Sequence, residues 1–197
     1  MIELWTAHDA SAWRAALERY DAVVARQEVA ALPALDRWYH DTLPSSIAGR
    51  DPAHVTHEEL VRVTEWKMAR GVWRARNLAL VKGNEPERVV RLSTDALRTI
   101  PDASAPIAVL SALAGVGPAT ASAVAAAAAP AHYPFFDELV AAQVPALGPV
   151  RFTHGYYARY AVALRERASA LGDGWMPAMV ERALWANVGG KRGSTAV

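Results

Sequence analysis

The 197-residue sequence contains no cysteine. Disulfide bonds, zinc sites built on cysteine and cysteine-bound iron–sulfur clusters are therefore excluded. Long apolar runs are also missing, because the richest stretch, residues 121–131, is mostly alanine and too short to cross a bilayer. The first residues lack the basic and apolar regions of a signal peptide. We therefore expect an intracellular protein without a membrane partner.

Neither positive nor negative charge predominates, since the formal net charge is only +1. The charges are nevertheless unevenly distributed along the sequence. Residues 1–49 carry seven acidic and four basic side chains, whereas residues 62–91 carry eight basic and three acidic ones. A basic segment beside an acidic one is typical of a protein that binds a polyanion. Solvated helix faces would produce the same pattern, so the distribution alone leaves the partner open.

The sequence shows no sustained period-two alternation, and helical patterns fill most of it, which predicts an all-α fold. Caps, prolines and glycines divide it into helices expected at 10–30, 33–42, 57–70, 72–81, 86–100, 105–114, 118–129, from 137, 154–171 and 176–188. We expect residues 1–197 to form one unit of two helical lobes with a cleft between them, dividing near residues 100–104.

Residues 107–129 carry the most specific pattern, two helices joined by Gly115-Val116-Gly117. Two glycines around one apolar residue allow a sharp reversal, and Val116 is expected to turn inward. The first amides of the next helix, including those of Ala119 and Thr120, have no helical partner, and the helix dipole adds positive charge there. This geometry predicts a socket for a phosphate oxygen.

The segment resembles the helix-hairpin-helix motif, through Leu113, Gly115, Val116, Gly117, Thr120 and Ala121. The resemblance implies binding to the phosphate backbone of double-stranded DNA. An ordinary αα-corner, in which the glycines serve packing alone, is the alternative.

The sequence after the hairpin also resembles that of the helix-hairpin-helix DNA glycosylase superfamily, and specifically of an uncharacterised, glycosylase-like branch. In that family a lysine two residues past the second glycine serves strand cleavage, and a catalytic aspartate follows beyond a loop. Here these positions hold Ala119 and Asp137. The resemblance therefore implies a monofunctional glycosylase without lyase activity, in which Asp137 stabilises the sugar cation or activates water. Aspartate is also a favoured N-cap, which offers a purely structural role for Asp137.

Further site residues come from the basic run and from nearby aromatic side chains. The run Trp66 to Arg74 resembles one that precedes such hairpins in glycosylase-like proteins, and its basic residues are candidates to contact phosphate: Lys67, Arg70, Arg74 and Arg76. A glycosylase extrudes its target nucleotide, which requires a wedge and a pocket. The aromatic candidates are Trp66, Trp73, Tyr133 and Phe136, and core packing is the alternative for each.

Three functions stay open at this level: a monofunctional glycosylase acting on a damaged or modified base, a non-catalytic DNA-binding module on the same scaffold, and a helical interaction protein. We expect a monomer. No metal site is expected, since His54 and His57 have no acidic or histidine cluster around them. No cofactor is expected either, although the hairpin leaves room for a monovalent cation.

Overall fold

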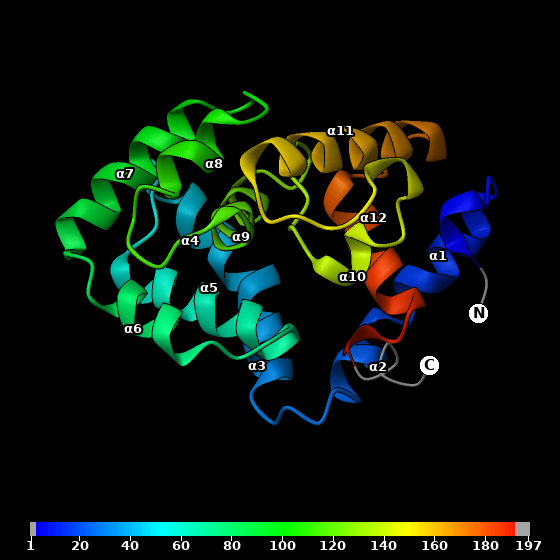
Figure 1. The fold of residues 1–197 in the computed structure, drawn as a ribbon, viewed down its shortest axis with the longest axis horizontal. Coiled ribbons are helices and arrows are strands. Elements are labelled where there is room, and N and C mark those ends of the chain that lie inside the picture. The colour runs from blue at the N-terminus through cyan, green and yellow to red at the C-terminus, as the bar shows by residue number, and fades with distance from the viewer. Residues whose placement is uncertain (1–2, 192–197) are drawn as a thin grey trace.

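The computed structural model describes residues 3–191, and all regular structure within that range is helical, with no strand (Figure 1). The predicted all-α class is confirmed. Between residues 3 and 191 no helix combines the length and the apolar character needed to cross a membrane.

The helices begin close to their predicted caps. Asp9 accepts a hydrogen bond from the Ser11 amide, and Thr56 and Glu59 form the expected capping box. The elements before the hairpin are η1 (Leu4–Thr6), α1 (Ala10–Glu18), α2 (Tyr20–Ala25), α3 (Leu32–Arg37), η2 (Trp38–Thr42), α4 (Leu43–Ala48), α5 (His57–Arg70), α6 (Ala75–Lys82) and α7 (Pro86–Arg98). The remaining ones are α8 (Ala105–Leu110), α9 (Pro118–Ala128), α10 (Glu138–Ala141), η3 (Pro145–Leu147), α11 (His154–Leu171) and α12 (Pro177–Asn187).

The helices form two lobes that share one continuous core. Helices α3 to α9 pack together as a central lobe (Figure 1). The N-terminal helices α1 and α2 pack on the C-terminal helix α12, and together with α10 and α11 they form a terminal lobe. Residues 100–104, the division expected from the sequence, lie instead between α7 and α8, which pack against each other. The chain passes between the lobes at residues 26–31 and 129–137, so the terminal lobe is built from both ends of the sequence.

The α3–α4 region departs from the sequence prediction. A helix ending before Pro44 was expected, but the chain continues through the π-helical turn η2 directly into α4. Proline lacks an amide donor and crowds the carbonyl four residues earlier, and both problems are relieved where Pro44 lies in the first turn of α4 after the wider π turn. The turn carries Tyr39 and His40.

Two further differences concern the ends of helices. The helix expected over 10–30 is broken at Arg19 and ends at Ala25, and the one expected over 72–81 begins at Ala75. Gly71, which follows α5, has φ −127° and is not in the left-handed region. Residues 71–74 therefore form a loop between α5 and α6.

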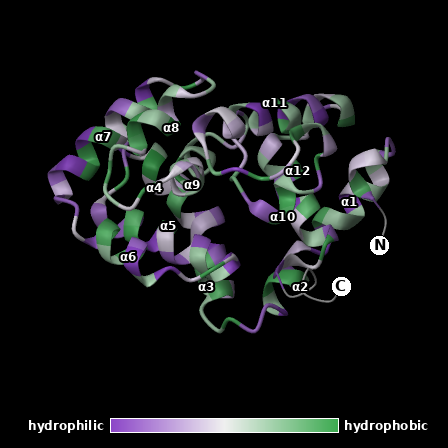
Figure 2. Ribbon diagram, viewed as in Figure 1, coloured by the Kyte–Doolittle hydropathy of each residue, from purple (hydrophilic) through white to green (hydrophobic). Residues whose placement is uncertain are grey.

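Helix α9 lies at the centre of the molecule because its alanines allow close approach. Ala121, Ala123 and Ala125 are fully buried, and α4, α5 and α8 all pack against this helix. The hydroxyl of Tyr39 donates to the Ala123 carbonyl at 2.6 Å. By contrast, peripheral α7 alternates between hydrophobic and hydrophilic residues, as a half-exposed helix does (Figure 2).

Candidate nucleic-acid interface and inter-lobe cavity

The hairpin has the backbone form that the sequence predicts. Helices α8 and α9 pack together and are joined by a turn in which Gly115 has φ +75°, a conformation that favours glycine. Val116 is 5% exposed, which confirms its inward position. Gly117 differs from Gly115, since its φ of −98° is open to any residue.

Two side chains from the α6–α7 region, Asn84 and Arg88, form hydrogen bonds with the backbone before the turn. Asn84 forms two hydrogen bonds of 2.9 Å with the backbone of Ala114, one to its amide and one to its carbonyl. Arg88 donates to the Ala112 carbonyl at 3.0 Å. The hairpin is therefore held in a fixed position relative to the central lobe.

Gly115 faces α6, so a Cβ at this position would meet α6. A Cβ at Gly115 would lie 2.6 Å from the Asn77 carbonyl oxygen and 2.9 Å from the Leu80 Cβ. At Gly117 a Cβ would meet nothing within 4 Å. Gly115 therefore serves packing, and Gly117 is the glycine that faces open space.

Gly117 is exposed and caps α9. Among the described residues, the amides of Gly117, Ala119 and Thr120 have no hydrogen-bond partner, and Pro118 has no amide hydrogen. Unpaired first-turn amides with the positive end of a helix dipole form an anion-binding geometry. Ala119 is half-buried and the Thr120 side chain is buried, so they offer their backbone rather than their side chains.

The basic residues fall into three situations. Arg74 and Arg76 are exposed at the start of α6, and Arg76 precedes the Asn77 carbonyl against which Gly115 packs. Lys67 is half-buried, and its burial, together with the charge of Arg74, lowers its pKa. Arg70 is fully buried, so the structure contradicts its expected role as a phosphate contact.

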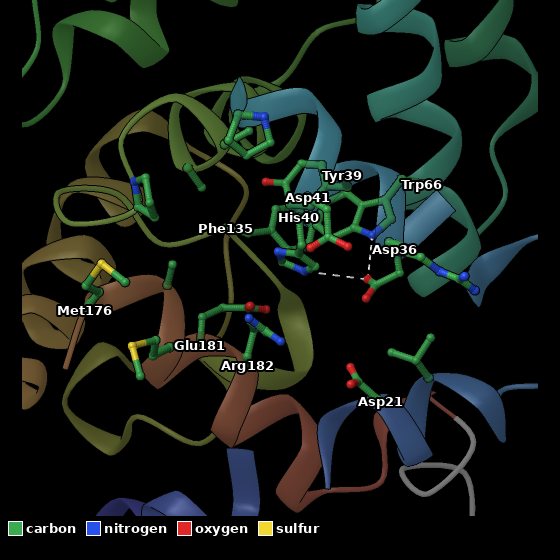
Figure 3. A pocket seen from close by; sticks show the side chains of 18 of the residues that line it. Asp21, Asp36, Tyr39, His40, Asp41, Trp66, Phe135, Met176, Glu181 and Arg182 are labelled. Carbon is green, nitrogen blue, oxygen red and sulfur yellow. Dashed lines mark hydrogen bonds and ion pairs between the residues drawn. The ribbon is translucent and has the colours of Figure 1, made fainter. Parts of the chain in front are cut away.

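A cavity of about 690 Å³ lies between the lobes, bounded by α2, α3, η2, α5 and α12 and by the C-terminal end of α9 (Figure 3). Its aromatic wall contains Tyr39 stacked on Trp66, with ring centroids 3.6 Å apart, and Phe135. The charged and titratable lining residues are Asp21, Asp36, Arg37, His40, Asp41, Glu181 and Arg182.

Arg70 is the centre of a buried cluster behind the cavity wall. Its Nη2 lies 2.6 Å from Glu181 Oε1 and 3.5 Å from Asp137 Oδ2. Its Nη1 donates to the Tyr20 hydroxyl at 3.2 Å, and that hydroxyl donates to Asp36 at 2.8 Å. The guanidinium also lies over the rings of four surrounding aromatic residues: Tyr20, Trp66, Phe135 and Trp185. The cluster therefore joins α2, α3, α5 and α12.

The cluster shifts the titration of its acids and of a neighbouring histidine. Burial raises the pKa of Glu181 to about 7, opposed by Arg70 and reinforced by the charge of Asp137. Burial likewise raises the pKa of Asp137, with Arg70 opposing. Burial and the positive charges of Arg182 and Arg70 lower the pKa of His40 to about 2. His40 is therefore neutral near pH 7, and its 3.7 Å approach to Asp36 is not an ion pair at that pH.

Asp137 does not line the cavity. Its side chain is 9% exposed, caps α10 by accepting from the Leu139 amide at 2.8 Å and faces Arg70. Its approach to the hairpin helix follows from Ser122, whose hydroxyl accepts from the Phe136 amide and donates to the Ala119 carbonyl. Ser122 thus links Ala119, in the first turn of α9, to Phe136, the residue before Asp137.

The four aromatic candidates occupy different environments. Trp66 is fully buried and donates to Asp36 at 2.8 Å, so it belongs to the cavity wall and is not placed as a wedge. Trp73 is 57% exposed in the α5–α6 loop. Tyr133 and Phe136 are core residues, which corrects their assignment to a pocket. Tyr133 donates to the Asp102 carbonyl, and Phe136 packs among Tyr156, Tyr157 and Tyr160.

Sequence reasoning missed most of the cavity: Asp36, Tyr39, His40, Glu181 and Arg182. They come from helices far apart in the chain, and no local motif joins them. One signal was present, since the α12 stretch places charged Glu181 and Arg182 beside apolar neighbours on a helix that must bury most of its surface. Within residues 3–191 there is no group of three or more acidic or histidine side chains that could hold a metal ion.

A scan against protein-family models and searches of curated proteins and of solved structures find no match to this chain.

Proposed function

We propose that this chain binds the backbone of double-stranded DNA at the N-terminal end of α9, and that it releases an extruded base held in the inter-lobe cavity. The observation that carries the proposal is the position of α9. Its first turn presents the unpaired amides beyond Gly117, and its last residues, Ala126 and Ala127, line the cavity. Ala126 lies nine positions after Gly117, which corresponds to about 14 Å along the helix axis.

This separation between the hairpin amides and the cavity is compatible with DNA. One strand would bind through a phosphate at the hairpin, and a nucleotide extruded from the same stack would reach the cavity. A cavity with the stacked Tyr39–Trp66 pair as wall and carboxylates around it matches the needs of a flat, hydrogen-bonding heterocycle. Exposed Trp73, next to Arg74 and Arg76, supplies a wedge with phosphate-binding charge beside it.

The resemblance to helix-hairpin-helix glycosylases supports the same proposal through Gly115, Val116, Gly117 and Asp137. Because Ala119 offers no amine, the product is an abasic site that becomes a strand break only after alkali treatment.

A non-catalytic DNA-binding module on the same scaffold is the second candidate, and one observation favours it. Asp137 does not line the cavity. Its carboxylate instead contacts Arg70 and accepts a hydrogen bond from the Leu139 amide of α10. In that case the hairpin contacts would persist and no base would be released.

Replacement of Gly117 by aspartate tests the DNA contact. Gly117 has the extended backbone of an N-cap and open space around its Cα, so aspartate there fits and caps α9. Its charge would lie where the phosphate binds. We expect unchanged or higher stability but at least a tenfold weaker affinity for a fluorescent duplex, and a wild-type affinity that falls steeply with salt.

The matched control is Gly117→Asn, which has the same shape and capping ability without the charge. It should bind duplex more tightly than Gly117→Asp, with the gap narrowing as salt screens the repulsion. Equal affinities for the two variants, or a flat salt response of the wild type, would place the DNA contact elsewhere. Wild-type protein incubated with duplexes carrying alkylated, deaminated or oxidised bases then decides between glycosylase and non-catalytic module.

A further inference from the structure

Two buried carboxylates share the Arg70 guanidinium, but they differ in their access to the cavity. Glu181 lines the cavity, with its side chain extending from α12 (Figure 3). Asp137 is also buried against Arg70 but is not among the lining residues. Only one oxygen of Glu181, Oε1, is bonded to Arg70; among residues 3–191 the other, Oε2, makes no hydrogen bond. Glu181 is therefore a cavity-lining acid with one oxygen held by Arg70 and one oxygen without a hydrogen-bond partner among the described residues.

Two buried carboxylates beside one guanidinium favour the protonated form of one of them. A single Arg70 compensates one negative charge, yet Glu181 and Asp137 are both buried beside it. Burial and the charge of Asp137 raise the pKa of Glu181 to about 7. A neutral Glu181 still accepts the 2.6 Å hydrogen bond through Oε1 and carries its proton on Oε2. The groups that influence its titration are Arg70, Arg182, Asp137, Tyr20, Tyr39 and Tyr160.

We propose that Glu181, not Asp137, donates a proton to the departing base, and that the substrate is consequently an uncharged nucleobase. This inference rests on the proposed base release. An uncharged base leaves its sugar as an anion unless a ring nitrogen is protonated, whereas an N-alkylated cationic base leaves as a neutral molecule without help.

The step balances with water as the co-reactant. The bond between C1′ and the base nitrogen breaks, and its electron pair passes to the base. The Glu181 Oε2 proton moves to a base nitrogen, so the base departs neutral. Water adds to C1′, and the proton that it loses returns to the Glu181 carboxylate. Arg70 is a positioning residue, because it holds Oε1 and thereby directs Oε2.

The experiment compares two leaving groups under single-turnover conditions. One set of duplexes carries uracil or hypoxanthine, which are uncharged, and another carries cationic 7-methylguanine. Glu181→Gln keeps the shape and can still pair with Arg70, but it has no proton to donate. We expect it to lower release of an uncharged base at least 100-fold, a typical effect of losing a general acid, and to change release of 7-methylguanine less than tenfold. Exposed Glu138→Gln is the control and should match the wild type.

Wild-type protein that releases an uncharged base, together with an equally active Glu181→Gln, would overturn the inference and leave the proposed function standing. Release of 7-methylguanine alone would do the same. Release of no base from any duplex would end the proposed catalysis and the inference with it, while the Gly117 variants would still report on DNA binding.

Two measurements on wild-type protein cover the case in which Glu181→Gln does not fold. The release rate for an uncharged base should fall about tenfold for each pH unit above 7, because the acid form disappears. A carbon-13 carboxyl titration should show a glutamate that ionises near neutral pH. A rate independent of pH between 5 and 9, or all glutamates ionised at pH 5, would overturn the assignment.

Discussion

The two ends of α9 differ in how far apart in the sequence their surrounding residues lie. The hairpin end consists of residues adjacent in sequence, Leu113 to Thr120, and its geometry follows from backbone torsions and unpaired amides. The cavity end is assembled from α2, α3, η2, α5 and α12, and its geometry follows from side chains that share one buried cation. Helix α9 therefore connects the hairpin, which a short sequence motif predicts, to the cavity, which no local motif predicts.

The comparison also separates roles that the sequence treats as equal. Gly115 and Gly117 look alike in the motif, yet one packs on α6 and the other faces open space. Asp137 is the acid that the resemblance indicates, yet Glu181 is the acid that reaches the cavity. In both pairs the neighbours supplied by distant helices decide which residue is free to meet a ligand.

Removal of the Arg70 charge should produce the largest effect and confine it to the cavity end. Arg70→Met would leave Glu181 and Asp137 buried without their cation, so we expect a loss of about 3–5 kcal/mol in the free energy of unfolding. Urea denaturation measures it, with exposed Arg74→Met as the control expected within about 0.5 kcal/mol of the wild type. A loss below about 1 kcal/mol would mean that the cluster does not depend on this charge.

The same variant distinguishes the hairpin end of α9 from the cavity end. Under conditions in which Arg70→Met remains folded, its affinity for undamaged duplex should equal that of the wild type, because Arg70 is buried and cannot reach a phosphate on the surface. Arg74→Met should show the reverse, normal stability with weaker and less salt-dependent binding.

A Cβ at the packed glycine should give the next largest effect. Gly115→Ala combines a positive φ with a 2.6 Å approach to the Asn77 carbonyl, a backbone atom that cannot move aside cheaply. We expect a loss of about 3 kcal/mol. Gly117→Ala is the matched control and should stay within about 0.5 kcal/mol, since its Cβ meets nothing. Equal losses in thermal or urea denaturation would show that the two glycines are equivalent after all.

The sequence predicted what depends on near neighbours and missed what depends on distant ones. The caps at Asp9 and Thr56, the hairpin, and Asp137 at the start of α10 all follow from residues within a few positions of each other. The π turn before Pro44 was missed because proline at that point usually ends a helix. Arg70 was assigned to the surface because its charge, taken alone, favours water, and nothing local indicates that Glu181 lies 111 positions away as its partner.

The smallest effect concerns the proton in the cavity cluster and is best measured as a difference between two proteins. Glu181 has a pKa of about 7 in the folded chain and an ordinary value of 4.5 when unfolded. Its stabilising contribution is therefore complete below pH 4.5 and is lost as pH rises through 7.

His40 acts in the opposite direction. Its pKa is lowered to about 2, so its contribution is complete above its ordinary value of 6.5 and is lost as pH falls. Because His40 is present in both proteins, subtracting the free energy of unfolding of Glu181→Gln from that of the wild type removes its effect. We expect this difference to decrease by about 2 kcal/mol between pH 5 and 7.5. A constant difference across that range would mean that Glu181 is ionised throughout, and that the cavity end holds no proton to give.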